Sequence, residues 1–175
     1  LNRPYGDLWL LARPLAYKAH PYQWATIGKE LSHIENATMQ DVKSFFFSHY
    51  APNNAIISIS GNVSLRNVKH LAKKWFGDIP RRNIAPRNIP QEPEQTEKRT
   101  LTIERNVPAS CIFKASHMCG QTNPDFYATD LISDILSNGK SARLYQNLVE
   151  KQKLFSEIHA YITGEIDPGL FIITG

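Results

Sequence analysis

The chain has 175 residues, of which 42% are hydrophobic and 21% are charged, so its composition is that of a soluble globular protein with one or two domains rather than a disordered chain. No apolar run approaches the roughly 18 residues that a membrane-spanning helix requires, and two cysteines do not make a disulfide framework. The formal net charge is +4, but the basic residues belong to predicted amphipathic helices and a linker without any recognition motif, so nucleic-acid binding is not favoured.

The N-terminal part of the chain predicts short helical segments around one turn. Residues 1–6 resemble neither a signal peptide nor a natural start. Residues 6–19 are helix-capable, and Pro14 is expected to break that helix. The tripeptide His-Pro-Tyr at 20–22 predicts a turn, and residues 26–35 predict short helical or loop segments.

A capped helix is predicted from residue 38 onward. The Thr38 side chain can accept a hydrogen bond from the first turn, and Asp41 can complete a capping box. Apolar side chains then recur at three-and-four spacing up to Tyr50, which places them on one face of the helix. Pro52 cannot continue the helix, so we expect it to end near Tyr50.

A strand and a second helix are predicted to follow. Residues 55–60 alternate between an apolar face and a mostly polar face, which predicts a short strand closed by Gly61 and Asn62. From Ser64 to Gly77 the apolar positions keep a helical period, and most Lys and Arg side chains fall on the other side. Both helices are therefore expected to lay aromatic-rich faces on the strand.

A proline-spaced linker is predicted over residues 80–99, because prolines interrupt a polar stretch that has almost no apolar periodicity. Beyond it, residues 100–106 and 109–118 predict two strands. A helix is predicted to start after Asn123-Pro124 and to end at Asn138-Gly139.

The apolar face of that helix is expected to point inward. Its members are Phe126, Ala128, Leu131, Ile132, Ile135 and Leu136. Ser141 can cap a further helix, and residues 157–163 and 170–174 predict two more strands. The predicted fold class is α+β, with antiparallel or mixed sheets and helices packed on one face.

The histidines contain no established zinc motif, because none pairs with another at helical metal-ligand spacing as in HExxH or HxxEH. The six are His20, His33, His49, His70, His117 and His159. One weaker grouping that stays open beside plain packing or exposure is His33 with Glu35. Another is His117 with Cys119 and Cys111, which alternate onto one side of a strand.

The two cysteines are interpreted as unpaired thiols. Cys111 and Cys119 are eight residues apart, which on an extended strand is roughly 26 Å and far beyond disulfide reach. A catalytic role for either thiol with a distant histidine stays open, although burial in a strand is the default for such a side chain. The chain has no GxSxG, P-loop or GxGxxG motif, so the residues alone identify no active site.

Several blocks of sequence occur in a characteristic order along nearly the whole chain. They are His-Pro-Tyr at 20–22 with Ile-Gly at 27–28, residues 38–54 with 59–63, residues 71–80 (LAKKWFGDIP) and, past the linker, residues 135–148 (ILSNGKSARLYQNL). Together they resemble the pitrilysin or insulinase family of zinc metallopeptidases, the M16 group that includes the mitochondrial processing peptidases.

The resemblance implies two related α+β domains that form half of a clamshell, with zinc held in the first domain by an HxxEH helix and a downstream Glu. The order of motifs puts both features before Leu1. We therefore expect residues 1–79 to be the end of the first M16 domain, 80–99 a linker, and 100–175 the start of the second. No catalytic, metal-binding or substrate-binding residue is carried onto this chain, and zinc is expected in the parent protein only.

The resemblance also bears on transition-state stabilisation. In one type of family member, an Arg and a Tyr seven residues later follow the Gly-Ser-Arg-Leu turn and hold the substrate carbonyl and the developing oxyanion. Val149 and Ser156 occupy those positions here, and neither supplies a guanidinium or phenol donor. The parent is thus expected to resemble the zinc-bearing subunit type and to need a partner, a second M16-like subunit or a homo-oligomer.

The function implied is that of a fragment of a zinc metalloendopeptidase that hydrolyses peptides or small unfolded proteins in a clamshell cavity, the fragment itself being inactive. The alternative is a non-catalytic M16-like scaffold or peptide-binding subunit, and an intact upstream HxxEH would favour the peptidase. We expect a soluble protein, with the bacterial cytoplasm or periplasm as the favoured compartment. The isolated chain is also predicted to self-associate through unpaired strand edges and exposed apolar faces.

Overall fold

The computed structural model describes residues 4–175, which form two compact units. We call residues 4–27 and 90–175 the sheet unit, and residues 28–89 the helical unit. Within residues 4–175, no helix is long and apolar enough to cross a membrane. The predicted M16 domain boundaries at 79/80 and 99/100 remain a prediction.

The sheet unit is built on three antiparallel strands, β1 (Phe113–His117), β2 (His159–Ile162) and β3 (Leu170–Thr174). Their order is β1-β3-β2, so β3 is central and β1 is an edge strand. The strands at the C-terminal end confirm the predicted pair. The β1–β3 pairing also continues past the strand ends, because Met118 donates to Gly169 O at 3.0 Å.

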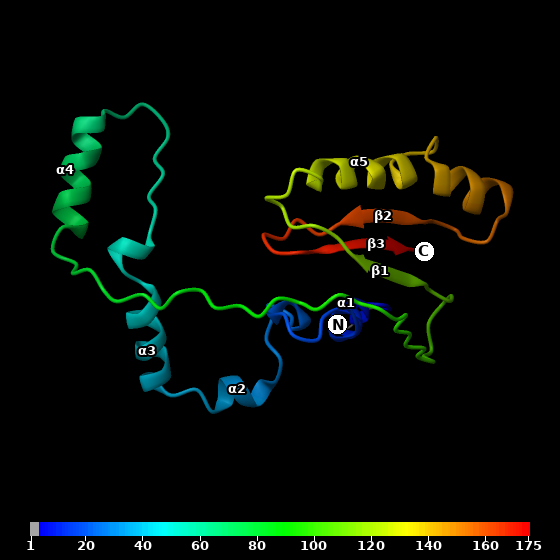
Figure 1. The fold of residues 1–175 in the computed structure, drawn as a ribbon, viewed down its shortest axis with the longest axis horizontal. Coiled ribbons are helices and arrows are strands. Elements are labelled where there is room, and N and C mark those ends of the chain that lie inside the picture. Colours follow the sequence, from blue (N-terminus) through cyan, green and yellow to red (C-terminus); the bar gives the residue numbers. More distant parts are fainter. Residues whose placement is uncertain (1–3) are drawn as a thin grey trace. The chain divides into compact units, whose positions relative to one another are not determined.

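Helices lie on both faces of this sheet (Figure 1). Helix α1 (Leu8–Ala16) covers one face, where Ala16 and Tyr17 form a buried cluster with Leu170 and Ile172 of β3. Helix α5 (Phe126–Ser137) covers the other and packs on β2, and the Ser137 hydroxyl donates to Ala160 O at 2.9 Å. The expectation that helices cover one face only is therefore wrong for this unit. A 3₁₀ turn (Pro21–Gln23) follows α1, and a π-helical segment (Tyr145–Lys151) follows α5.

Three local expectations for the sheet unit are corrected. Pro14 lies inside α1, which ends only at Ala16. Residues 100–106 form no strand. Arg105 of this segment instead pairs with Asp7 at 2.6 Å, so a side-chain contact rather than a backbone ladder holds the segment.

The inward face of α5 also differs from the predicted one. Leu131 and Ile132 are 60% and 50% exposed, whereas Phe126 and Ser133 are buried. The Ser133 hydroxyl donates to Asp130 O at 2.8 Å, so its polar atom is satisfied within the helix. A small side chain on the buried face lets the helix approach the sheet closely, and hydrophobicity alone did not reveal this.

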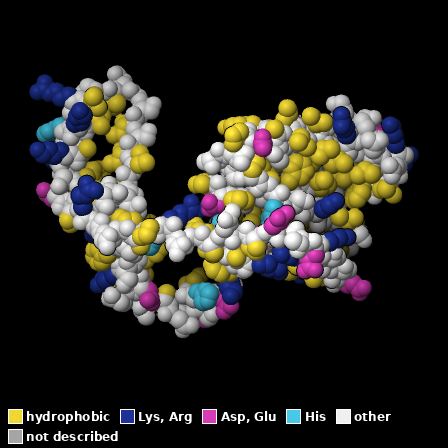
Figure 2. Space-filling model, viewed as in Figure 1, with side chains coloured by type: hydrophobic (Ala, Val, Ile, Leu, Met, Phe, Trp, Pro, Cys, Tyr) yellow, Lys and Arg dark blue, Asp and Glu magenta, His cyan; other side chains and the backbone are white. Residues whose placement is uncertain are grey.

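The helical unit contains α2 (Leu31–Glu35), α3 (Met39–His49), a 3₁₀ turn (Pro52–Asn54) and α4 (Leu65–Phe76). The predicted caps are confirmed. Asp41 N–H donates to Thr38 Oγ1 at 3.2 Å, Thr38 N–H donates back to Asp41 Oδ2 at 2.9 Å, and Ser64 caps α4. Figure 2 shows Lys and Arg side chains along one side of α4 and hydrophobic ones along the other.

The strand predicted at residues 55–60 is absent from the helical unit. Ala55 has extended dihedral angles, but the segment pairs with no strand among the described residues, and Ile56 is 98% exposed. A strand requires a partner for its backbone groups, which alternation of side chains cannot supply. The aromatic faces of α3 and α4 consequently remain exposed rather than packed on a strand, as at Phe45 and Trp75.

Candidate functional site

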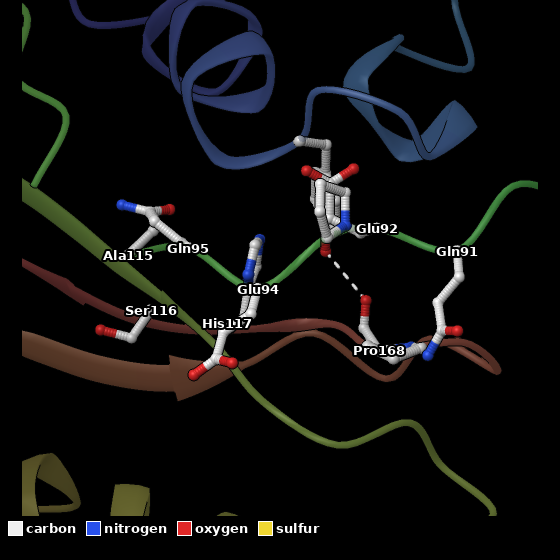
Figure 3. Close-up of a pocket in the computed structure, with 10 residues that line it drawn as sticks. Gln91, Glu92, Glu94, Gln95, Ala115, Ser116, His117 and Pro168 are labelled. Atoms are coloured by element: carbon white, nitrogen blue, oxygen red, sulfur yellow. Dashed lines mark hydrogen bonds between the residues drawn. The ribbon is translucent and has the colours of Figure 1, made fainter. Parts of the chain in front are cut away.

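A groove of about 600 Å³ opens in the sheet unit beside the edge strand β1 (Figure 3). One wall is β1 and the other is the extended segment 91–95, and both Tyr17 and Pro168 contribute to the lining. The residues are Tyr17, Gln91, Glu92, Pro93, Glu94, Gln95, Ala115, Ser116, His117 and Pro168. This volume falls in the range of sites for small ligands or short peptides.

Glu92 fixes the segment 91–95 against the chain that follows α1. Its carboxylate accepts three backbone N–H groups, from Lys18 at 2.7 Å and from Ala19 and His20 at 2.8 Å each. Partial burial alone raises the pKa of a carboxyl group, but the three amides and the nearby His117 favour the charged form more strongly. The pKa of Glu92 therefore lies below its usual value.

His20 is buried and both of its ring nitrogens face protein groups. Nδ1 accepts the Tyr22 N–H at 3.1 Å, so the proton of the neutral ring lies on Nε2. Nε2 lies 3.4 Å from Asp167 Oδ2, an ion-pair distance without hydrogen-bond geometry in the described part of the chain. With its basic nitrogen used as a cap, His20 stabilises the turn and is neither a general base nor a metal ligand.

Tyr17 joins this cluster as a buried donor. Its hydroxyl donates to Pro168 O at 3.1 Å, and its ring centroid lies 5.3 Å from that of His117. Burial first, and the negative charge of Glu165 second, raise the pKa of the Tyr17 hydroxyl well above its usual range. His117 in turn directs Nε2 to Ala16 O at 2.8 Å, so Nε2 carries the proton. The ring atoms near the groove thus act in structure, and the groove itself offers shape, charge and backbone groups.

Sequence reasoning missed this groove and the role of Glu92. Glu92 stands between Pro90 and Pro93 in a stretch that predicts only a linker. Its three partners are 72 to 74 residues earlier in the chain. No local pattern signals such a contact.

The comparisons with known proteins identify the family. A sequence model described as "Peptidase M16 inactive domain" matches residues 36–175. The chain belongs to the M16 peptidase family. The predicted resemblance is thereby confirmed.

Individual M16 relatives agree with this assignment. The zinc protease PqqE of Helicobacter pylori is 31% identical over 98% of this chain and 39% of its own length. The probable mitochondrial-processing peptidase subunit beta of Schizosaccharomyces pombe is 25% identical over 89% of this chain and 36% of its own length. The chain therefore spans about two-fifths of the length of the relatives it matches.

Solved structures show the same fold. The crystal structure of a protease from Helicobacter pylori has a TM-score of 0.80 at 31% identity, covering 99% of this chain and 42% of that one. The peptidase M16 inactive domain from Pseudomonas fluorescens has a TM-score of 0.75 at 24% identity, covering 98% and 41%, and supports the fold alone.

The side chains of this M16 chain do not fit a zinc site. Among residues 4–175, no three His, Cys, Asp or Glu side chains are grouped closely enough to hold a metal ion. His33 and Glu35 are exposed on α2, apart from any such group. Cys111 and Cys119 are free thiols, as predicted, and the Cys111 sulfur lies 3.8 Å from Ile112 O rather than near a histidine.

The two positions that the resemblance assigns to Arg and Tyr lie near the end of the π-helical segment and beyond it. Val149 is half-buried within Tyr145–Lys151, and Ser156 is exposed in the loop before β2. Their significance for catalysis remains a prediction.

Proposed function

We propose that this chain is a non-catalytic portion of an M16 zinc metalloendopeptidase that hydrolyses peptides or small unfolded proteins. The observation that carries the proposal is the match of residues 36–175 to the inactive domain of the family. Relatives named zinc proteases support a peptidase parent with Zn²⁺ as its cofactor. The zinc ligands and general base would come from the part of the parent outside this chain.

The parent would act together with a second M16-like chain. Val149 and Ser156 stand where a family donor pair is expected, and neither side chain can stabilise a developing oxyanion by a guanidinium or phenol group. A relative named as a subunit of a processing peptidase supports assembly as part of the proposal.

Zinc content and peptide hydrolysis test the proposal. The full-length protein should bind about one zinc per chain and cleave an unfolded, internally quenched peptide, and adding a partner subunit that carries Arg and Tyr should increase the rate. The 175-residue chain alone should give no hydrolysis above the blank. Hydrolysis by the isolated chain, or full-rate cleavage by the parent without a partner, would contradict the respective part of the proposal.

A non-catalytic scaffold or peptide-binding subunit is the second candidate. It is favoured by the groove, whose nearby His20 and Tyr17 are committed to structural hydrogen bonds. A full-length protein that binds peptides but contains no zinc would establish this candidate and exclude the peptidase.

A further inference from the structure

The open edge of β1 carries backbone groups that no other strand uses. In an antiparallel ladder the hydrogen bonds of successive residues point alternately to the two sides. Ile112 exchanges N–H and C=O bonds with Gly175, and Met118 donates to Gly169, so the even-numbered residues face β3. Phe113, Ala115 and His117 therefore direct their N–H and C=O groups to the outer edge. No backbone hydrogen bond to these groups is recorded on that side within the described residues.

The groove lies along this same edge. Ala115 and His117 point to the α1 face of the sheet and Ser116 to the opposite face, because side chains alternate along a strand. All three line the groove, which must therefore extend around the edge rather than cover one face. The far wall is segment 91–95, fixed by the three hydrogen bonds to Glu92 (Figure 3). The geometry is that of a slot with one wall made of unused peptide groups.

The charge of the slot is negative. Its lining contains the carboxylates Glu92 and Glu94 and no Lys or Arg. Glu94 is exposed, and Glu92 remains ionised at neutral pH because its amide partners favour the charged form. Complementary charge in a bound chain would come from Lys or Arg side chains.

We infer that the groove binds an extended, basic segment of substrate polypeptide as an additional strand on β1. Backbone hydrogen bonds to Phe113, Ala115 and His117 would provide affinity, and Glu94 would select basic side chains. The inference rests on the proposed function, since a peptidase or a peptide-binding subunit encounters polypeptide chains. It names a substrate contact on the inactive portion of the protein, away from any zinc.

Peptide binding to the full-length protein tests this inference. The protein is treated with a chelator to prevent hydrolysis, and a fluorescent peptide of alternating Lys and Val is titrated by anisotropy at low salt. A peptide with the same side chains but N-methylated at alternate amides loses ladder donors and should bind at least tenfold more weakly. A peptide with Glu in place of Lys should be weakened to a similar degree.

Matched variants place the binding at β1. Glu94→Lys should weaken the Lys peptide severalfold and strengthen the Glu peptide, whereas Glu97→Lys, on the same segment but outside the groove, should change neither. Ala115→Pro removes an outward N–H and spares the bonds to β3, so it should weaken binding while Ala115→Gly does not. The Glu94 and Glu97 pair remains informative if the proline variant fails to fold.

The outcomes separate this inference from the proposed function. Equal affinity for the N-methylated peptide, or equal effects of Glu94→Lys and Glu97→Lys, would overturn the inference even if the protein contains zinc and cleaves peptides. Failure of the Lys peptide to bind, with the groove filled by another part of the parent or by a second copy, would overturn it as well. Selective binding by a protein without zinc or hydrolysis would support the inference while excluding the peptidase.

Discussion

Glu92 shows how one side chain organises the sheet unit. Three consecutive backbone N–H groups converge on its carboxylate, at distances of 2.7 to 2.8 Å. The last of them belongs to His20, whose own ring caps the next turn. A single charge thus orders the chain after α1 and the wall of the groove together.

We predict that Glu92→Gln destabilises the sheet unit by about 1–2 kcal/mol at neutral pH, because the neutral amide is a weaker acceptor and partial exposure limits the loss. Urea unfolding followed by tryptophan fluorescence measures it, since Trp9 packs edge-to-face on Phe113 at 6.0 Å. Glu97→Gln, on the same segment, is the control and should change the free energy of unfolding by less than about 0.5 kcal/mol.

The pH dependence of that difference provides a second check. The pKa of Glu92 is lower in the native protein than its ordinary value of 4.5, so the unfolded chain binds the proton more readily. The stabilisation is then fully present above pH 4.5 and is lost as the pH falls through the lowered native value. A difference between wild type and Glu92→Gln that did not shrink in acid would show that the charge is not its source.

At the scale of elements, the sequence predicted what depends on neighbours along the chain. The caps of α3 and α4 depend on residues three apart, and both form as expected at Thr38 and Ser64. Strand 55–60, strand 100–106 and the buried face of α5 depend on partners far along the chain, and these predictions failed. The groove belongs to the second kind, because Glu92 meets residues more than 70 positions away.

The capping box of α3 predicts a measurable helix preference in isolation. In a peptide of residues 36–52, Thr38→Ala should lower the helix content and cost about 1 kcal/mol of helix stability, whereas Thr38→Ser should retain most of it. Circular dichroism measures both. Equal helicity of the Ala and Ser peptides would show that the cap does not contribute.

The same peptide should lose helicity in acid. Hydrogen bonds from the Thr38 side chain and backbone lower the pKa of Asp41. The charged form therefore stabilises the helix above the ordinary pKa, 3.8, and this contribution disappears as the pH falls through the lowered value. Thr38→Ala should flatten this part of the titration.

At the scale of the whole chain, the main feature is apolar surface without a cover. Phe45, Phe46 and Trp75 of the helical unit are each about half exposed or more, and Ile56 is almost fully exposed. Contiguous apolar surface of this kind marks a place where another chain or segment binds. Because the chain spans about two-fifths of its relatives, further parts of a parent protein are natural partners for these faces.

We therefore predict that the isolated 175-residue chain self-associates, because a second copy can cover the surfaces that its own residues leave open. Light scattering at increasing concentration should show a rising average mass. Ile56→Lys and Phe46→Ser should lower the association, since each places a polar group on the exposed segment or on α3. Ile166→Ser, at an exposed apolar position of the sheet unit, is the matched control and should have less effect. A monomer at high concentration would instead show that water tolerates these faces, and their exposure would no longer indicate a missing partner.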